Sequence, residues 1–189
     1  MRRFVLPAGL LMAALTCTLS ADDKPDTKAK GTKVNFDGMT STTPATWVEK
    51  MPSNKMRFMQ FELPKVKGDK EDAELVVFKG LGGSAMANIT RWKDQFVAPK
   101  GKSADDISKE TEIKIGDKAA TQVVVTGTFK YNPAPFNPRS KNELRPDYKM
   151  IAIHFEGPKD IYHIKLTGPT KTIESYEKGF DAWIKGFKE

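Results

Sequence analysis

The segment 148–168, YKMIAIHFEGPKDIYHIKLTG, constrains the fold most, because it contains two alternating strands joined by one short turn. Residues 157–160 (GPKD) interrupt the alternation and predict a four-residue hairpin loop. With such a loop, His154 faces His163 across the hairpin. This register also places the apolar residues of both strands on one face, which supports it. That apolar face has to be buried against another layer of the protein.

The other patterned segments predict further strands and two helices. Strands are indicated by apolar or alternating residues at 56–63, 73–78 and 111–131, the last as two strands around a Gly-Asp turn. Apolar residues at helical spacing predict a helix over 85–96 and another at the C-terminus, which Thr170 or Thr172 would cap. Because the strands are joined mostly by hairpins, we expect an α+β fold with a central antiparallel sheet flanked by helices.

The stretch GLGGSAM at 80–86 lies between the strand at 73–78 and the first predicted helix. Its glycines match part of a dinucleotide-binding loop, but the region where an acidic residue should close the next strand reads as a loop. A nucleophile elbow needs a second glycine where Met86 stands. We therefore predict a tight turn in which Ser84 caps the helix. A hydrolase using Ser84 is the alternative, and it requires a histidine within hydrogen-bonding reach.

The N-terminus has the pattern of a secretory signal peptide. Two arginines precede the apolar residues 4–15, and small residues stand before the expected cleavage after residue 21. We expect residues 1–21 to be removed, 22–33 to form a flexible leader, and 34–189 to form a single domain. The protein would then be exported, to the periplasm or the extracellular space, with no transmembrane segment.

The composition excludes several classes of function. The only cysteine is Cys17, inside the predicted signal peptide, so the mature chain has no disulfide, thiolate metal site or cysteine nucleophile. Lysine and arginine (31) exceed aspartate and glutamate (24), but the two signs are interleaved, which is typical of a solvated surface. A nucleic-acid surface would need a stripe of one sign with aromatic residues in it. We expect neither a nucleic-acid partner nor a cofactor.

The proline-rich segment 132–147 is predicted to be a long loop, and loops of this length are often functional. It contains Phe136 near Arg139 and Arg145, a combination that suits contact with a protein or an anionic ligand. The alternative is that Phe136 is buried in the core and that the prolines only stiffen the connection.

The two histidines give a second candidate site, because the hairpin register brings them together. His154 and His163 could hold a divalent metal with Glu156 completing the shell, or could titrate as a pair near neutral pH. The alternative is a polar strand face on which the two rings only stack. Two ligands do not make a tight metal site, and the sequence identifies no third.

Two longer segments, GGSAMANITRWKDQF and YHIKLTGPTKTIESYEKGFDAWIKGF, resemble a family of exported bacterial proteins of unknown function from planctomycete-like genomes. The segments MRFMQFELP and AELVVFKGLGG fit the same family, so the resemblance covers most of residues 40–189. That family resembles the PsbP fold of the photosystem II extrinsic subunits. The resemblance implies a central antiparallel sheet between helical layers and a non-enzymatic role, without naming a ligand.

The sequence therefore favours an exported, non-catalytic binding or accessory protein whose protein or small-molecule partner is unknown. One alternative is a weak binder of a divalent metal or a small ligand at His154 and His163. The other alternative is a hydrolase built on Ser84.

Overall fold

The computed structural model of the protein describes residues 30–134 and 137–189. The predicted signal peptide, residues 22–29 of the predicted leader, and Phe136 lie outside the described residues. The described helices and strands are β1 (Lys33–Phe36), β2 (Met39–Thr42), β3 (Val48–Lys50), β4 (Met59–Leu63), β5 (Ala73–Lys79), α1 (Ala85–Lys93), β6 (Phe96–Val97), a 3-10 turn (Asp105–Ile107), β7 (Ser108–Ile115), β8 (Lys118–Tyr131), β9 (Glu143–Glu156), β10 (Ile161–Pro169) and α2 (Thr170–Lys185).

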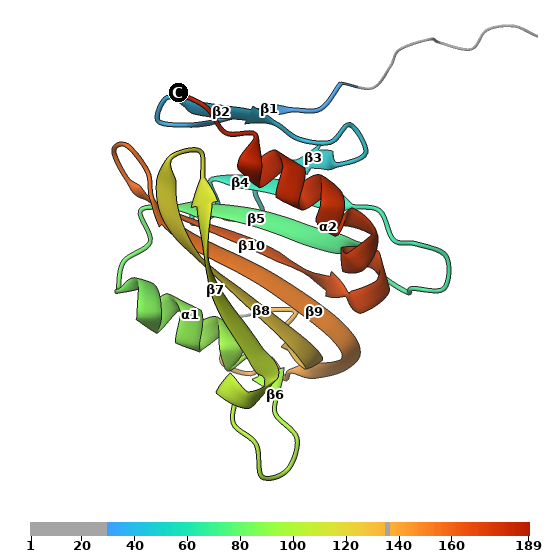
Figure 1. The fold of residues 1–189 in the computed structure, drawn as a ribbon. Helices are drawn as coiled ribbons and strands as arrows, with labels where there is room; N and C mark the ends of the chain where they lie inside the picture. Colours follow the sequence, from blue (N-terminus) through green and yellow to red (C-terminus); the bar gives the residue numbers. More distant parts are fainter. Residues whose placement is uncertain (1–29, 135–136) are drawn as a thin grey trace, which may run out of the picture.

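One large antiparallel sheet organises the described chain (Figure 1). Its strand order is β3-β4-β5-β10-β9-β8-β6, with β7 also paired to β8, and β1 and β2 form a separate hairpin. Neither α1 nor α2, nor any other helix in the described part of the chain, is long and apolar enough to span a bilayer. The α+β class predicted from the sequence, an antiparallel sheet flanked by helices, is confirmed.

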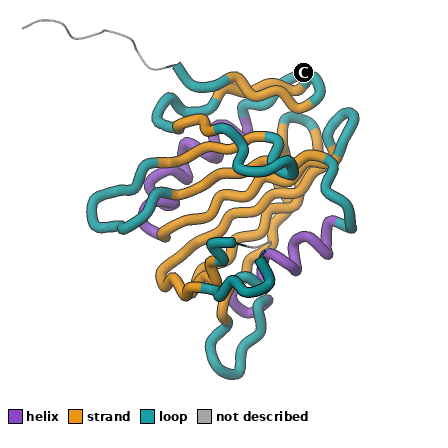
Figure 2. The backbone as a smooth tube through the Cα atoms, turned by 180° about the vertical axis from the view of Figure 1, so that it is seen from behind, coloured by secondary structure: helices purple, strands orange, loops and turns teal. Residues whose placement is uncertain are grey.

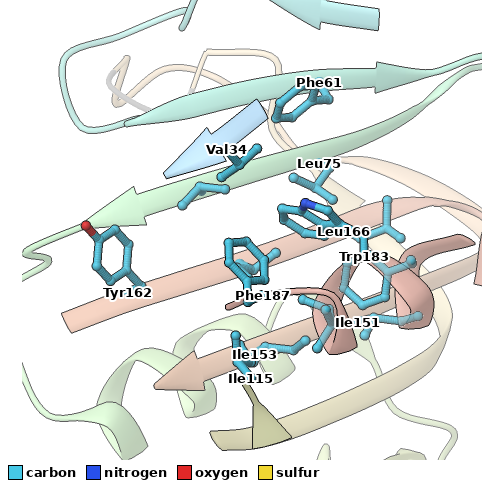
Figure 3. Packing of buried hydrophobic residues seen from close by; sticks show 14 of the residues in the cluster. Val34, Phe61, Leu75, Ile115, Ile151, Ile153, Tyr162, Leu166, Trp183 and Phe187 are labelled. Carbon is cyan, nitrogen blue, oxygen red and sulfur yellow. The ribbon is translucent and has the colours of Figure 1, made fainter. Parts of the chain in front are cut away.

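The sheet buries one face under α2 and the β1–β2 hairpin. Because successive strand residues point to opposite faces, Ile151 and Ile153 share this face. They belong to a cluster with Phe36 of the hairpin and with Phe180 and Trp183 of α2. Figure 3 shows the packing of this cluster. Burying each such side chain contributes about 1.5–3 kcal/mol. Because this cluster contains more buried side chains than the cluster on the opposite face, it is the main core.

The opposite face packs against α1, and we call it the α1 face (Figure 2). Met150 and Ala152 of β9 point to it, together with Val123 of β8. They form a second cluster with Ile89 and Trp92 of α1. Helix α1 begins as the sequence predicts, because Ser84 Oγ accepts a hydrogen bond of 3.1 Å from the Ala87 amide.

The hairpin of β9 and β10 has the predicted register: His154 pairs with His163, and Ile161 pairs with Glu156. The predicted cap of the helix that follows is wrong. Helix α2 is capped by Asp69, whose carboxylate accepts hydrogen bonds from the amide (2.9 Å) and the hydroxyl (2.6 Å) of Thr172. The cap comes from the β4–β5 loop, so local sequence at the start of α2 does not reveal it.

The predicted loop 132–147 is too long, because β9 already begins at Glu143. Its first residues pair with the end of β8, including Arg145 opposite Phe129. Pro146 is tolerated in this strand because the register shifts between Gly127 and Phe129, and prolines in sheets are found at such bulges. Arg145 is therefore a strand residue with a fixed direction.

The β1–β2 hairpin was not predicted. Strand β1 begins at Lys33, within the predicted leader. Asp37 and Gly38 form the two-residue turn with φ of 52° and 116°, a backbone that Asp-Gly turns adopt readily. Asp37 also joins the hairpin to the sheet, because it accepts hydrogen bonds from Lys79 (2.7 Å) and the Tyr162 hydroxyl (2.9 Å).

Candidate ligand-binding site on the α1 face

A cavity of about 450 Å³ opens on the α1 face, lined by side chains of β5, β8, β9 and β10 and of nearby loops. Cavities of this size hold small organic molecules in other proteins. Two hollows elsewhere are larger, about 700 and 790 Å³. In the described part of the chain, however, only the cavity of about 450 Å³ contains a half-buried lysine whose ammonium has no carboxylate partner.

That ammonium belongs to Lys165, which lies on β10 in the middle of the sheet. Its two cross-strand neighbours are Val76 of β5 and Ala152 of β9. Both neighbours are buried and apolar, so neither satisfies the charge. The side chain therefore has to find its partners in the space above the sheet.

The partners of the Lys165 ammonium are uncharged. It lies 5.9 Å from the ring centroid of Trp92 and 5.7 Å from that of Phe129, and it donates a hydrogen bond to Gln95 Oε1. Burial lowers the pKa of Lys165 to about 8, and the charge of Glu74 opposes this effect only in part. No ion pair involving Lys165 occurs among the described residues.

The two arginines of the cavity, in contrast, are already paired. Arg57 forms an ion pair of 2.6 Å with Glu74, which also accepts a hydrogen bond of 2.9 Å from Gln60. Arg145 forms an ion pair with Glu71. Lys165 is therefore the cation of the cavity that has no described ion-pair partner. The third lining carboxylate, Asp72, is exposed and forms no ion pair among the described residues.

Aromatic rings form much of the remaining wall. Tyr148 stacks on Phe129 with 5.6 Å between centroids, and its hydroxyl donates to Glu71. Burial and this hydrogen bond raise the pKa of Tyr148 to about 12, so it stays neutral. The Arg145 guanidinium lies 3.4 Å above the centroid of Tyr131 and holds that ring in place.

Thr167 adds one further polar group. It follows Lys165 by two residues on β10, so both side chains point to the α1 face, roughly 6.6 Å apart along the strand. The Thr167 hydroxyl is buried and has no hydrogen-bond partner among the described residues. A buried hydroxyl without a partner costs about 1–3 kcal/mol, which a ligand that bonds to it would recover.

The histidine pair lies on the same face, nearer the other end of β10. The ring nitrogens His154 Nδ1 and His163 Nδ1 are 3.3 Å apart, and the ring centroids are 4.7 Å apart. Burial lowers the pKa of His163 to about 4 and also lowers that of His154. His154 also pairs with Thr121 of β8, which in turn pairs with Glu112 of β7. Together with the pairing of His154 and His163, this places one residue from each of four neighbouring strands side by side across the sheet.

Glu156, the predicted third metal ligand, is exposed at the end of β9. Its charge favours the protonated form of His154, against the larger effect of burial. In the described part of the chain, no group of three metal-ligating side chains is close enough to hold an ion. The structure thus brings the two histidines together, but Glu156 does not form a three-ligand metal site with them.

Of the residues predicted to contact a partner that the structure describes, only Arg145 is found in the cavity. Arg145 lines the cavity, whereas Arg139 is exposed in the loop and is not among the residues that line it. Phe136 lies outside the described residues. Ser84, the alternative nucleophile, uses its hydroxyl to accept the Ala87 amide, and the described residues place no histidine in hydrogen-bonding contact with it.

Sequence reasoning missed the central residues of the cavity, Lys165 and Thr167. A signal for Lys165 was present, because the predicted hairpin register already places it opposite the apolar Ala152. A lysine beside an apolar residue on a covered face suggests an unusual environment. Its other neighbour, Val76, follows from a strand pairing that the sequence does not specify.

Comparisons with known proteins give structural matches only. No protein-family model and no curated protein matches the chain. The solution structure of cyanobacterial PsbP from Synechocystis has a TM-score of 0.48 at 7% identity, covering 89% of this chain and 98% of that chain. A Pseudomonas aeruginosa protein of unknown function, suggested to be a regulator, has a TM-score of 0.47 at 11% identity, covering 84% of this chain and 96% of its own.

Proposed function

We propose that the protein is a non-catalytic binding protein whose site is the cavity on the α1 face and whose ligand is a small anion. The main support is Lys165, a cation inside a cavity with aromatic and amide neighbours and no described counterion. An anion placed there gains a charge-assisted hydrogen bond in surroundings of low polarity, where such bonds are strong.

Binding fits the cavity better than catalysis does. Of its three described lining carboxylates, Glu71 and Glu74 are engaged by Arg145 and Arg57, and Asp72 is exposed to water. A general acid or base has to exchange a proton with the substrate, which such ion pairs oppose. The signal-like N-terminus supports export, so we propose that the ligand is bound in the periplasm or outside the cell.

A thermal-unfolding screen of residues 22–189 against small anions tests this function. An anion that binds only the folded protein raises the melting temperature by mass action. We expect at least one anion to do so, and we expect Lys165→Met to abolish the effect. Lys141→Met is the matched control, because Lys141 is exposed and does not line the cavity. An equal response in both variants would contradict the proposal.

A weak divalent-metal site at His154 and His163 is the second candidate, favoured by one distance. Two imidazole nitrogens bound to one tetrahedral Zn²⁺ at about 2.0–2.1 Å lie about 3.3 Å apart. The two Nδ1 atoms are 3.3 Å apart. We expect a small rise of melting temperature with Zn²⁺ that His154→Ala removes, and no rise in the wild type would exclude the site.

A further inference from the structure

The class of anion follows from the other groups that line the cavity, and this step rests on the proposed function. Three carboxylates line the cavity with Lys165: Glu71 and Glu74, each engaged by an arginine, and Asp72, which is exposed and has no ion pair among the described residues. The Asp72 carboxylate repels a ligand with two or three negative charges, whereas one negative charge is enough to balance Lys165. The lining therefore favours a monoanion.

The donors that remain suit a carboxylate group. The Lys165 ammonium has three N–H groups, and one of them is directed to Gln95. The Thr167 hydroxyl, on the same face of β10, has no described partner. A carboxylate has two oxygens that accept at different points, so it can use the ammonium and the hydroxyl together.

The apolar part of the wall suits a flat ring. Phe78, Phe129, Tyr131 and Tyr148 all line the cavity, together with the buried Val76. Aromatic rings in offset or edge contact add about 0.5–1.5 kcal/mol beyond the area that they bury, so a ring gains more here than an aliphatic body of equal size.

We infer that the cavity binds a small aromatic monocarboxylate, with its carboxylate at Lys165 and Thr167 and its ring against the aromatic wall. The Arg57–Glu74 and Arg145–Glu71 ion pairs flank the ligand, and the carboxylate of Asp72, which has no described ion pair, selects against anions of higher charge. About 450 Å³ leaves room for one ring with a short side chain.

Calorimetric titration with matched probes tests the class. The probes are 3-phenylpropionate, 3-cyclohexylpropionate with the same charge, 2-phenylethylamine with the opposite charge, phenyl phosphate and inorganic phosphate. We expect 3-phenylpropionate to bind at least about threefold more tightly than the cyclohexyl acid and more tightly than either phosphate. We expect no binding of 2-phenylethylamine.

Two variants separate the carboxylate contacts from effects on folding. Lys165→Met should weaken 3-phenylpropionate binding at least about tenfold. Thr167→Val keeps the side-chain shape and removes only a hydroxyl that has no described partner. We expect this variant to be at least as stable as the wild type, because the unpartnered hydroxyl is unfavourable in the folded state, and to lose about threefold to tenfold in affinity. An unchanged affinity in Thr167→Val would contradict the proposed carboxylate position.

The outcomes distinguish the ligand class from the function. Lys165-dependent binding of a phosphate or of the cyclohexyl acid, with weaker binding of 3-phenylpropionate, would overturn the aromatic monocarboxylate and leave an anion site in the cavity. Binding of no anion, or binding that Lys165→Met leaves unchanged, would overturn the proposed function and the ligand class together.

Discussion

Replacing Lys165 with methionine should stabilise the protein, because the folded state holds this ammonium away from water and without a counterion. Burial lowers the pKa of Lys165 from 10.5 to about 8. Each pH unit corresponds to about 1.4 kcal/mol, so the charged form costs the fold about 3 kcal/mol. Methionine removes that cost. It also removes the two long cation–π contacts with Trp92 and Phe129, about 0.5 kcal/mol each, and the hydrogen bond to Gln95, about 1 kcal/mol. We expect a net gain of about 1 kcal/mol at pH 7.

The free energy of unfolding of the wild type should depend on pH in a direction that the lowered pKa of Lys165 determines. Between pH 8 and 10.5 the unfolded chain keeps the lysine proton that the folded chain has lost, so the free energy of unfolding of the wild type rises with pH. Below pH 8 both states are protonated and the full cost is present. Urea unfolding followed by circular dichroism, from pH 7 to 10.5, measures the difference between Lys165→Met and the wild type, with Lys141→Met as control. A variant that is less stable than the wild type at pH 7, or a difference that does not change with pH, would refute this reasoning.

Three more changes test other parts of the structure. Burial lowers the pKa of His163 to about 4, so the wild type loses stability as the pH falls below 6.5, where the unfolded chain binds a proton that the folded chain does not. His163→Phe should reduce this loss, which melting temperatures at pH 4.5 and 7 measure. An equal fall of melting temperature in both proteins would argue against it. Asp69→Ala should lower the free energy of unfolding by about 1 kcal/mol, since it removes the cap on Thr172; an unchanged urea midpoint would show that the cap contributes nothing. Ser84→Ala should cost about 1 kcal/mol in the same assay and leave anion affinity unchanged; a loss of affinity would mean that Ser84 has a role beyond capping.

Much of the fold could be predicted from local pattern. The β9–β10 register followed from one turn and one alternation, because a slip of a single residue would reverse the face of every apolar side chain. The β1–β2 hairpin was missed although its Asp-Gly turn is a known hairpin signal, since its strands have only four residues each. The start of β9 was missed because prolines suggested a loop, whereas pairing with the long β8 extends the strand through Pro146.

The candidate site was predicted only in fragments. Arg145 was selected for its place in a proline-rich segment, but its position depends on strand pairing and on its ion pair with Glu71, a residue far away in sequence. Lys165 gave no motif, because what distinguishes it is the absence of a counterion in three dimensions. The histidine pair was predicted as a contact because it depends on one hairpin alone.

The sequence by itself determined the features that depend on neighbouring residues: the turns, the alternation of strands, the Ser84 cap and the facing of His154 and His163. The tertiary structure alone decided the order of the strands, the Asp69 cap on α2 and the cavity around Lys165. The physical reason is range. Backbone conformation and side-chain direction are set within a few residues, whereas burial, ion pairing and pKa values depend on which distant segments pack together.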